Sequence, residues 1–136
     1  MTAVKESIDV AKESAAVWAV MGDPGGISEW LPAILSSPYR DGVRRCTLDG
    51  GVEVDERVLE HSDSGQFYVY TIIKGGFDVH DYVSRLEVED NDGGSRVTWS
   101  SEFEAGNPDE ADSIAEAFAG LYRMGLESIK SLAEAS

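Results

Sequence analysis

The stretch that decides the fold is Asn107–Leu132, NPDEADSIAEAFAGLYRMGLESIKSL, near the end of the 136-residue chain. Asn107 is a good helix N-cap, Pro108 fits the first turn, and the acidic residues that follow favour the positive end of a helix. Apolar residues then recur every three or four positions, as on one face of an α-helix: Ile114, Phe118, Leu121, Tyr122, Leu126, Ile129 and Leu132. The stretch therefore predicts a long helix from about Asp109 to Leu132, whose apolar stripe packs against a core.

The segment before this helix has the pattern of short strands separated by turns. Turn residues cluster at four places: Asp49–Gly51, Ser62–Gly65, Lys74–Gly76 and Asn91–Gly94. Their short spacing predicts an antiparallel meander, because parallel strands need longer connections. The predicted strands are Pro38–Arg40, Val43–Leu48, Val52–Glu60, Phe67–Ile73, Tyr82–Glu89 and Ser95–Glu104.

The N-terminal third predicts one more strand and two helices. Val4–Val10 reads as a strand, Lys12–Met21 as a helix, and Ile27–Leu31 as a short second helix that ends before Pro32. The order of strand, two helices, six strands and a long helix predicts an α+β fold. Its antiparallel sheet must bury one face against the last helix.

The composition favours one domain, residues 1–136, and disfavours several kinds of partner. The formal net charge of -15 repels nucleic acid and anionic lipid surfaces. We expect no signal peptide and no membrane span, since no apolar run is long enough, and therefore a cytoplasmic protein. Cys46 is the only cysteine and is interpreted as a small buried hydrophobe. The sequence leaves the oligomeric state open, a homodimer included.

A carboxylate stands on an apolar strand face. In Val52–Val58, VEVDERV, alternation places Glu56 on the same side as three valines: Val52, Val54 and Val58. A three-residue loop at Asp49–Gly51 would pair Glu56 with Arg44, whereas a two-residue turn would pair it with Arg45. We favour Arg44, because the three-residue loop also keeps two apolar residues of the preceding strand on that face: Cys46 and Leu48.

Further inward positions follow from the neighbouring strands. A five-residue loop at His61–Gly65 would place Tyr70 opposite Glu56 and Tyr68 opposite Val58. Alternation on the last two strands adds a set of apolar and polar residues: His80, Tyr82, Ser84, Leu86, Val88, Val97, Trp99, Ser101 and Phe103. Such a mixture suits a ligand cavity better than a dry core. Two interpretations of Arg44 and Glu56 stay open: they form a structural ion pair, or they belong to a reactive site.

Taken in order, these residues give the chain a family resemblance. The residues that carry it are Trp30, Pro32, Gly42, Arg44, Asp49–Gly51, Glu56, Arg57, Tyr70, Asp81, Tyr82, Val97–Trp99, Gly125 and Leu126. Together they resemble the bacterial polyketide cyclase/dehydrase branch of the START/Bet v 1-like superfamily (SRPBCC), over nearly the whole chain. The resemblance implies a helix-grip, in which a seven-stranded antiparallel sheet wraps around the C-terminal helix and encloses a hydrophobic cavity. Family members include cyclases, dehydratases and ligand binders, so it implies no single activity.

The local chemistry gives each candidate residue an expected role. The expected catalytic residues are Glu56 as general acid or base, tuned by Arg44, with Tyr70 and Tyr82 as hydrogen-bond donors and His80 as a proton relay. The expected ligand-binding residues are Trp30, Tyr39, Val58, Trp99, Ser101, Phe103, Phe118 and Tyr122. Such a site would act on a small apolar or polyketide-like ligand by cyclisation, dehydration or isomerisation.

No metal or other cofactor is expected, because the two histidines and the cysteine do not form a ligand pair. Two alternatives to an enzyme stay open. One is a non-catalytic carrier or sensor of a hydrophobic molecule. The other is an interaction module whose cavity is nearly filled by aromatic side chains.

Overall fold

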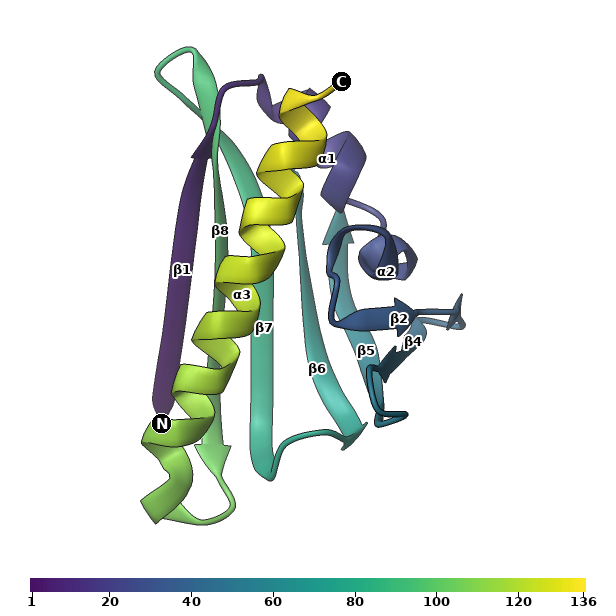
Figure 1. Ribbon diagram of the computed structural model, residues 1–136, viewed down its shortest axis with the longest axis vertical. Helices are drawn as coiled ribbons and strands as arrows, with labels where there is room; N and C mark the ends of the chain where they lie inside the picture. Colours follow the sequence, from purple (N-terminus) through teal and green to yellow (C-terminus); the bar gives the residue numbers. More distant parts are fainter.

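An antiparallel sheet of eight strands curves around one long helix in the computed structural model, which describes residues 1–136 (Figure 1). The strands are β1 Thr2–Val10, β2 Ile34–Ser36, β3 Tyr39–Arg40, β4 Val43–Leu48, β5 Glu53–Ser62, β6 Phe67–Gly75, β7 Val79–Asn91 and β8 Gly94–Ala105. The strand order is β1-β8-β7-β6-β5-β4-β2, and β3 pairs with β4. The helices are α1 Ser14–Met21, α2 Ile27–Trp30 and α3 Ala111–Glu134, with 3-10 turns η1 Pro24–Gly26 and η2 Pro108–Glu110.

This arrangement confirms the predicted helix-grip, with one strand more than expected. The additional strand is β2, which has three residues and was not among the predicted strands. Figure 1 shows α3 lying along the concave side of the sheet, and α1 and α2 beside it over the strands at one end. None of the helices combines the length and the apolarity needed to cross a membrane.

The long helix starts as its sequence predicts. The side chain of Asn107 accepts a hydrogen bond from the backbone N–H of Asp109, at 3.1 Å, and so caps the η2 turn that leads into α3. The predicted stripe is buried at most positions, but Leu132 is 44% exposed and Ala133 is buried in its place. The stripe therefore shifts by one residue at the end of the helix.

The register of the β4–β5 hairpin agrees with the favoured prediction. The N–H of Leu48 bonds to the carbonyl of Val52 at 2.7 Å, across the three-residue loop, and Arg44 stands opposite Glu56. Cys46 stands opposite Val54 and both are buried. Val52 itself is 51% exposed, contrary to prediction, because it lies in the loop, before β5 begins at Glu53.

The predicted register of β5 with β6 is wrong by two residues. Tyr70 stands opposite Val58, and Ile72 stands opposite Glu56. The hairpin loop is shorter than predicted, because Ser62 already pairs with Phe67, and an irregularity between Val58 and Glu60 adds a residue to β5. Such a bulge is not visible in an alternating sequence pattern.

The core is centred where α3 crosses the sheet. The ring of Trp99 on β8 stacks on Tyr122 of α3, with centroids 4.2 Å apart, and meets Trp30 edge to face at 5.5 Å. Gly125 lies against these rings, and a Cβ atom there would come within 2.8 Å of Trp99 and 2.9 Å of Trp30. The missing side chain of Gly125 thus lets the helix approach the two tryptophans.

We expect Gly125→Ala to lower the free energy of unfolding by about 1–3 kcal/mol, because overpacking against two buried rings outweighs the helix preference of alanine. Gly120→Ala is the matched control on the same helix, since no atom lies within 4 Å of its added Cβ. The free energy of unfolding of Gly120→Ala should rise by up to about 1 kcal/mol. Urea denaturation of both variants measures the difference, and equal stabilities would contradict the role given to Gly125.

Candidate functional site

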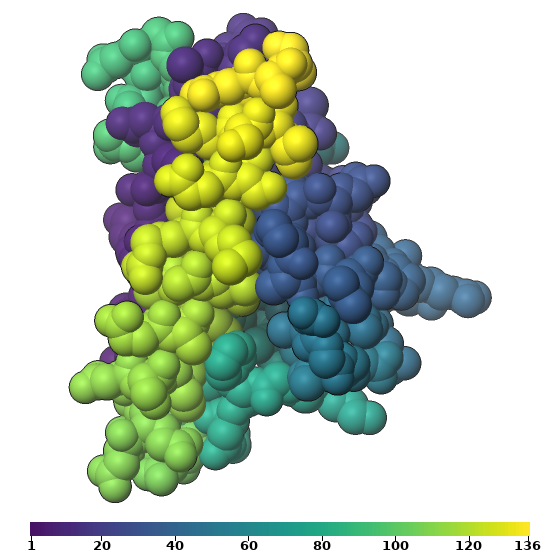
Figure 2. Space-filling model, viewed as in Figure 1, coloured from purple at the N-terminus to yellow at the C-terminus, as the bar shows by residue number.

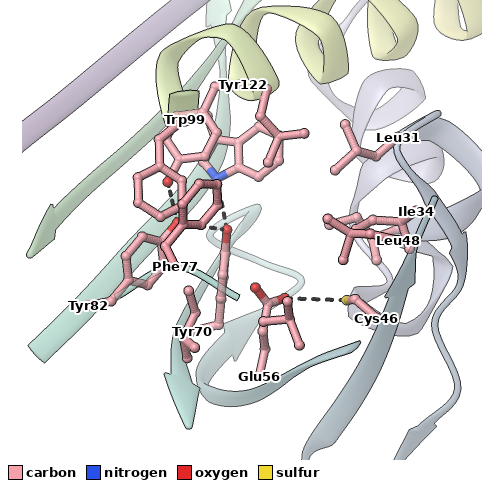
Figure 3. A pocket seen from close by; sticks show the side chains of 15 residues that line it. Leu31, Ile34, Cys46, Leu48, Glu56, Tyr70, Phe77, Tyr82, Trp99 and Tyr122 are labelled. Carbon is pink, nitrogen blue, oxygen red and sulfur yellow. Dashed lines mark hydrogen bonds between the residues drawn. The ribbon is translucent and has the colours of Figure 1, made fainter. Parts of the chain in front are cut away.

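An apolar chamber lies between α3 and the middle strands of the sheet (Figure 3). Its fifteen lining residues are Ile27, Leu31, Ile34, Cys46, Leu48, Val54, Glu56, Tyr70, Ile72, Phe77, Tyr82, Trp99, Phe118, Leu121 and Tyr122. The cavity volume is about 50 Å³. This volume is enough for a few water molecules, whereas ligand pockets usually measure about 300–1,000 Å³. The chamber is thus nearly filled by its own walls.

Glu56 is the only charged residue of the chamber wall, and its side chain is 12% exposed. Its Oε1 atom accepts hydrogen bonds from Arg44 Nε, at 2.8 Å, and from the thiol of Cys46, at 3.6 Å. No hydrogen bond in the structure involves Oε2. Figure 3 shows this second oxygen turned away from Cys46, on the chamber side. The wall therefore offers one carboxylate oxygen without a partner.

Arg44 lies behind Glu56 and is completely buried. Its Nη1 donates to the backbone carbonyl of Pro24, at 2.8 Å, and to the hydroxyl of Tyr68, at 3.2 Å. Its guanidinium also lies 4.5 Å from the ring centre of Tyr70. Burial opposes the charge of Arg44, but its neighbours Tyr68, Glu56, Tyr70 and Cys46 together outweigh burial and raise its pKa. Arg44 thus stays cationic and balances the charge of Glu56.

A row of hydrogen-bonded tyrosine hydroxyl groups forms another part of the chamber wall. The Nε1–H of Trp99 donates to the Tyr70 hydroxyl at 3.2 Å, and Tyr70 and Tyr82 hydroxyls lie 3.5 Å apart. Tyr82 also bonds to Tyr122, whose hydroxyl donates to Ser101 at 2.9 Å. Burial is the main reason that the pKa values of all three tyrosines are raised, so the phenols remain neutral.

Cys46 contributes a thiol that stays protonated. Burial and, next, the charge of Glu56 raise its pKa to about 12. The thiol is therefore a hydrogen-bond donor to Glu56 and a poor nucleophile at neutral pH.

The structure brings six of the predicted site residues together in the chamber wall: Glu56, Tyr70, Tyr82, Trp99, Phe118 and Tyr122. Four others are buried behind this wall and do not line the chamber: Arg44, Trp30, Ser101 and Phe103. Ser101 receives the hydrogen bond of Tyr122, and Trp30 supports Trp99.

Three predicted residues lie elsewhere, and their placement at the chamber is wrong. Tyr39 is 41% exposed, because its two-residue strand lies beside β4 away from the core. Val58 is only half-buried and does not line the chamber. His80 is exposed, because β7 carries an irregularity next to it where Asp81 has a positive φ of 53°, and the alternation reverses. His80 is therefore not placed to relay protons in the chamber.

Sequence reasoning missed Phe77, which closes one side of the chamber. Phe77 stands in the β6–β7 loop directly after Gly75 and Gly76, both with positive φ, and packs on Phe118 with centroids 4.4 Å apart. It lines the chamber and is still 37% exposed. A large apolar residue after two glycines is the signal that could have revealed it. In Figure 2 the surface is hollowed between α3, in yellow and green, and the blue and teal segments beside it.

The family model for polyketide cyclase / dehydrase and lipid transport proteins matches residues 1–134. The chain belongs to this family. No curated protein sequence matches the chain.

Solved structures share the fold of this family over nearly the whole chain. The protein XoxI from Bacillus cereus is 28% identical, with a TM-score of 0.89, covering 97% of this chain and 95% of that chain. Two more distant structures show the fold alone. The Zhui aromatase/cyclase from Streptomyces is 18% identical, with a TM-score of 0.76 and coverage of 97% and 93%. Norcoclaurine synthase from Thalictrum flavum is 20% identical, with a TM-score of 0.75 and coverage of 96% and 92%.

The buried ion pair makes a sharp stability prediction. Arg44→Met leaves the Glu56 charge buried without its partner, and we expect a loss of about 3–5 kcal/mol in the free energy of unfolding. The joint Arg44→Met, Glu56→Leu change should recover most of that loss, because an apolar pair can replace a buried ion pair.

The control for this experiment is the neighbouring pair of Arg45 with Asp55, whose Arg45 side chain is 54% exposed. Arg45→Met should lower the free energy of unfolding by less than about 1 kcal/mol. Guanidinium denaturation of the four proteins measures all of these values. Similar losses for Arg44→Met and Arg45→Met would contradict the structural importance of the buried pair.

Proposed function

We propose that this chain binds a small, mainly apolar molecule in the chamber, with the polar group of the ligand against Glu56. The observation that carries the proposal is the free Oε2 atom of Glu56 in a wall whose other residues are aliphatic, aromatic or cysteine. Ligand pockets commonly combine apolar walls with one or a few placed polar groups. The family description, which names cyclases, dehydrases and lipid transport, supports the same use of the chamber.

The small volume means that the chamber must open to admit a ligand. Phe77 is the residue best placed to move, because it is partly exposed and stands on a loop whose two glycines adopt left-handed conformations. Turning Phe77 away from Phe118 would expose the chamber to solvent without disturbing the strands. A ligand with a single aromatic ring has about the size of the Phe77 side chain, so it could take the place that this side chain leaves.

We expect Phe77→Ala to bind 4-ethylphenol about tenfold more tightly than the wild type, because the ligand no longer has to displace the phenyl ring. A factor of ten corresponds to about 1.4 kcal/mol of opening free energy. Isothermal titration calorimetry measures the affinity. Val83→Ala is the control, since Val83 is 45% exposed and lies outside the chamber.

The absence of binding to both the wild type and Phe77→Ala would contradict the proposal. It would favour instead an interaction module whose aromatic side chains fill the core. Equal affinities of wild type and Phe77→Ala would leave a binding chamber but place its opening elsewhere.

A second candidate function is proton transfer, and the same oxygen of Glu56 favours it. A carboxylate with a free oxygen in an apolar wall can act as a general base, and three tyrosines line the same chamber. Glu56 is also held in a buried ion pair with Arg44, at 2.8 Å, and such pairs often have a purely structural role, which is why binding remains the primary proposal. Cofactor-free isomerisation, dehydration or cyclisation would suit this arrangement.

If Glu56 is a general base, the wild type should accelerate the enol-to-ketone isomerisation of benzoylacetone, followed by ultraviolet absorbance. Glu56→Gln should then lower the rate by about 10² to 10⁴, while the melting temperature shows that the variant is folded. If the wild type binds benzoylacetone but the isomerisation is no faster than without protein, the protein is a carrier and not an enzyme.

A further inference from the structure

The hydrogen-bond donors of the chamber wall are all engaged within the protein. The Cys46 thiol donates to Glu56 Oε1, and the Trp99 N–H donates to Tyr70 and to Ser84. Tyr122 donates its single hydroxyl hydrogen to Ser101. The remaining polar side chains of the wall are two tyrosines and Glu56.

The two tyrosines are engaged as well, because each hydroxyl has only one hydrogen. Since the hydrogen of Tyr122 goes to Ser101, the bond between Tyr82 and Tyr122 uses the hydrogen of Tyr82. The contact between Tyr70 and Tyr82 then uses the hydrogen of Tyr70. The chain of hydroxyls therefore runs in one direction, from Trp99 to Ser101, and each hydroxyl hydrogen has a partner in it, the weakest bond being the 3.5 Å contact from Tyr70 to Tyr82.

Three buried donors have no partner in the structure, Trp30 Nε1, Arg44 Nη2 and Ser95 Oγ, but none of these residues lines the chamber. The free hydrogen-bonding position of the wall is consequently an acceptor, the Oε2 atom of Glu56. A ligand that also only accepts hydrogen bonds would leave both itself and Glu56 unpaired, which is costly in an apolar site.

We infer that the chamber selects neutral ligands that donate a hydrogen bond, phenols and enols above all, and discriminates against ligands that only accept one. This inference rests on the proposed binding function and adds the chemical class of the ligand. The bond would join the ligand hydroxyl to the ionised carboxylate of Glu56, and hydrogen bonds to charged groups are the stronger kind.

Charge excludes the remaining classes of ligand. A carboxylate ligand would meet the Glu56 carboxylate and a chain of net charge -15. An ammonium ligand would find the charge of Glu56 already balanced by Arg44, and it would have to give up its hydration in an apolar wall. A neutral ligand that donates a hydrogen bond suffers neither charge repulsion nor the loss of hydration of a charged group.

The test compares three single-ring compounds by calorimetry: 4-ethylphenol, acetophenone and phenylacetate. The first two have the same number of non-hydrogen atoms, and only the first donates a hydrogen bond. We expect 4-ethylphenol to bind the wild type at least about tenfold more tightly than acetophenone, and phenylacetate to bind most weakly.

Equal affinities for 4-ethylphenol and acetophenone would overturn the inference and leave the proposed binding function intact. Tightest binding of phenylacetate would also overturn it. The failure of all three compounds to bind, in Phe77→Ala as well, would instead remove the proposed function itself.

Two variants test the assignment of the donor and acceptor directly. In Glu56→Gln the amide oxygen can keep the bond to Arg44 while the amide N–H₂ faces the chamber, so acetophenone should gain affinity and 4-ethylphenol should lose its advantage. In Tyr122→Phe the hydroxyl of Tyr82 loses its acceptor, which frees a donor for acetophenone. Thermal melting identifies the folded variants, and an acetophenone affinity that rises in neither folded variant would overturn the inference.

Discussion

The buried charge of Arg44 is the constraint on which the rest of this structure depends. An arginine without solvent exposure must find its partners inside the protein, and here they come from three separate parts of the chain: Glu56 on β5, Tyr68 on β6 and the carbonyl of Pro24 in η1. These bonds tie the helical segment after β1 to the middle of the sheet. They also fix the orientation of Glu56, because its Oε1 atom is occupied while Oε2 is left for the chamber.

The aromatic side chains supply the other half of the site. Trp99 is held by the hydroxyls of Tyr70 and Ser84 and by stacking on Tyr122, so its ring has little freedom to move. The absence of a side chain at Gly125 lets α3 approach closely enough for this stacking. Sheet and helix are thus joined by directional contacts as well as by apolar packing, and the chamber is the small space that these contacts leave.

Much of this arrangement could be predicted from the sequence because it follows from local periodicity. The apolar stripe of α3 and the glycine turn at Asp49–Gly51 determine the helix and the register of Arg44 with Glu56. Tyr70 lines the chamber as predicted, but its strand partner was predicted wrongly, because the β5–β6 loop is shorter than its turn residues suggest and β5 carries a bulge. The orientation of His80 was also predicted wrongly, because the irregularity beside it in β7 leaves no mark in the alternation. The role of Phe77 is equally non-local, since it depends on how the β6–β7 loop folds back onto α3.

The three tryptophans of the chain lie in different surroundings. Trp30 and Trp99 are almost completely buried and touch each other beside the chamber, whereas Trp18 is half-buried and donates to the exposed carboxylate of Asp63. Indole fluorescence responds to polarity and to nearby quenching groups. The protein therefore carries an optical reporter of the chamber, in Trp99 above all, together with an internal reference in Trp18.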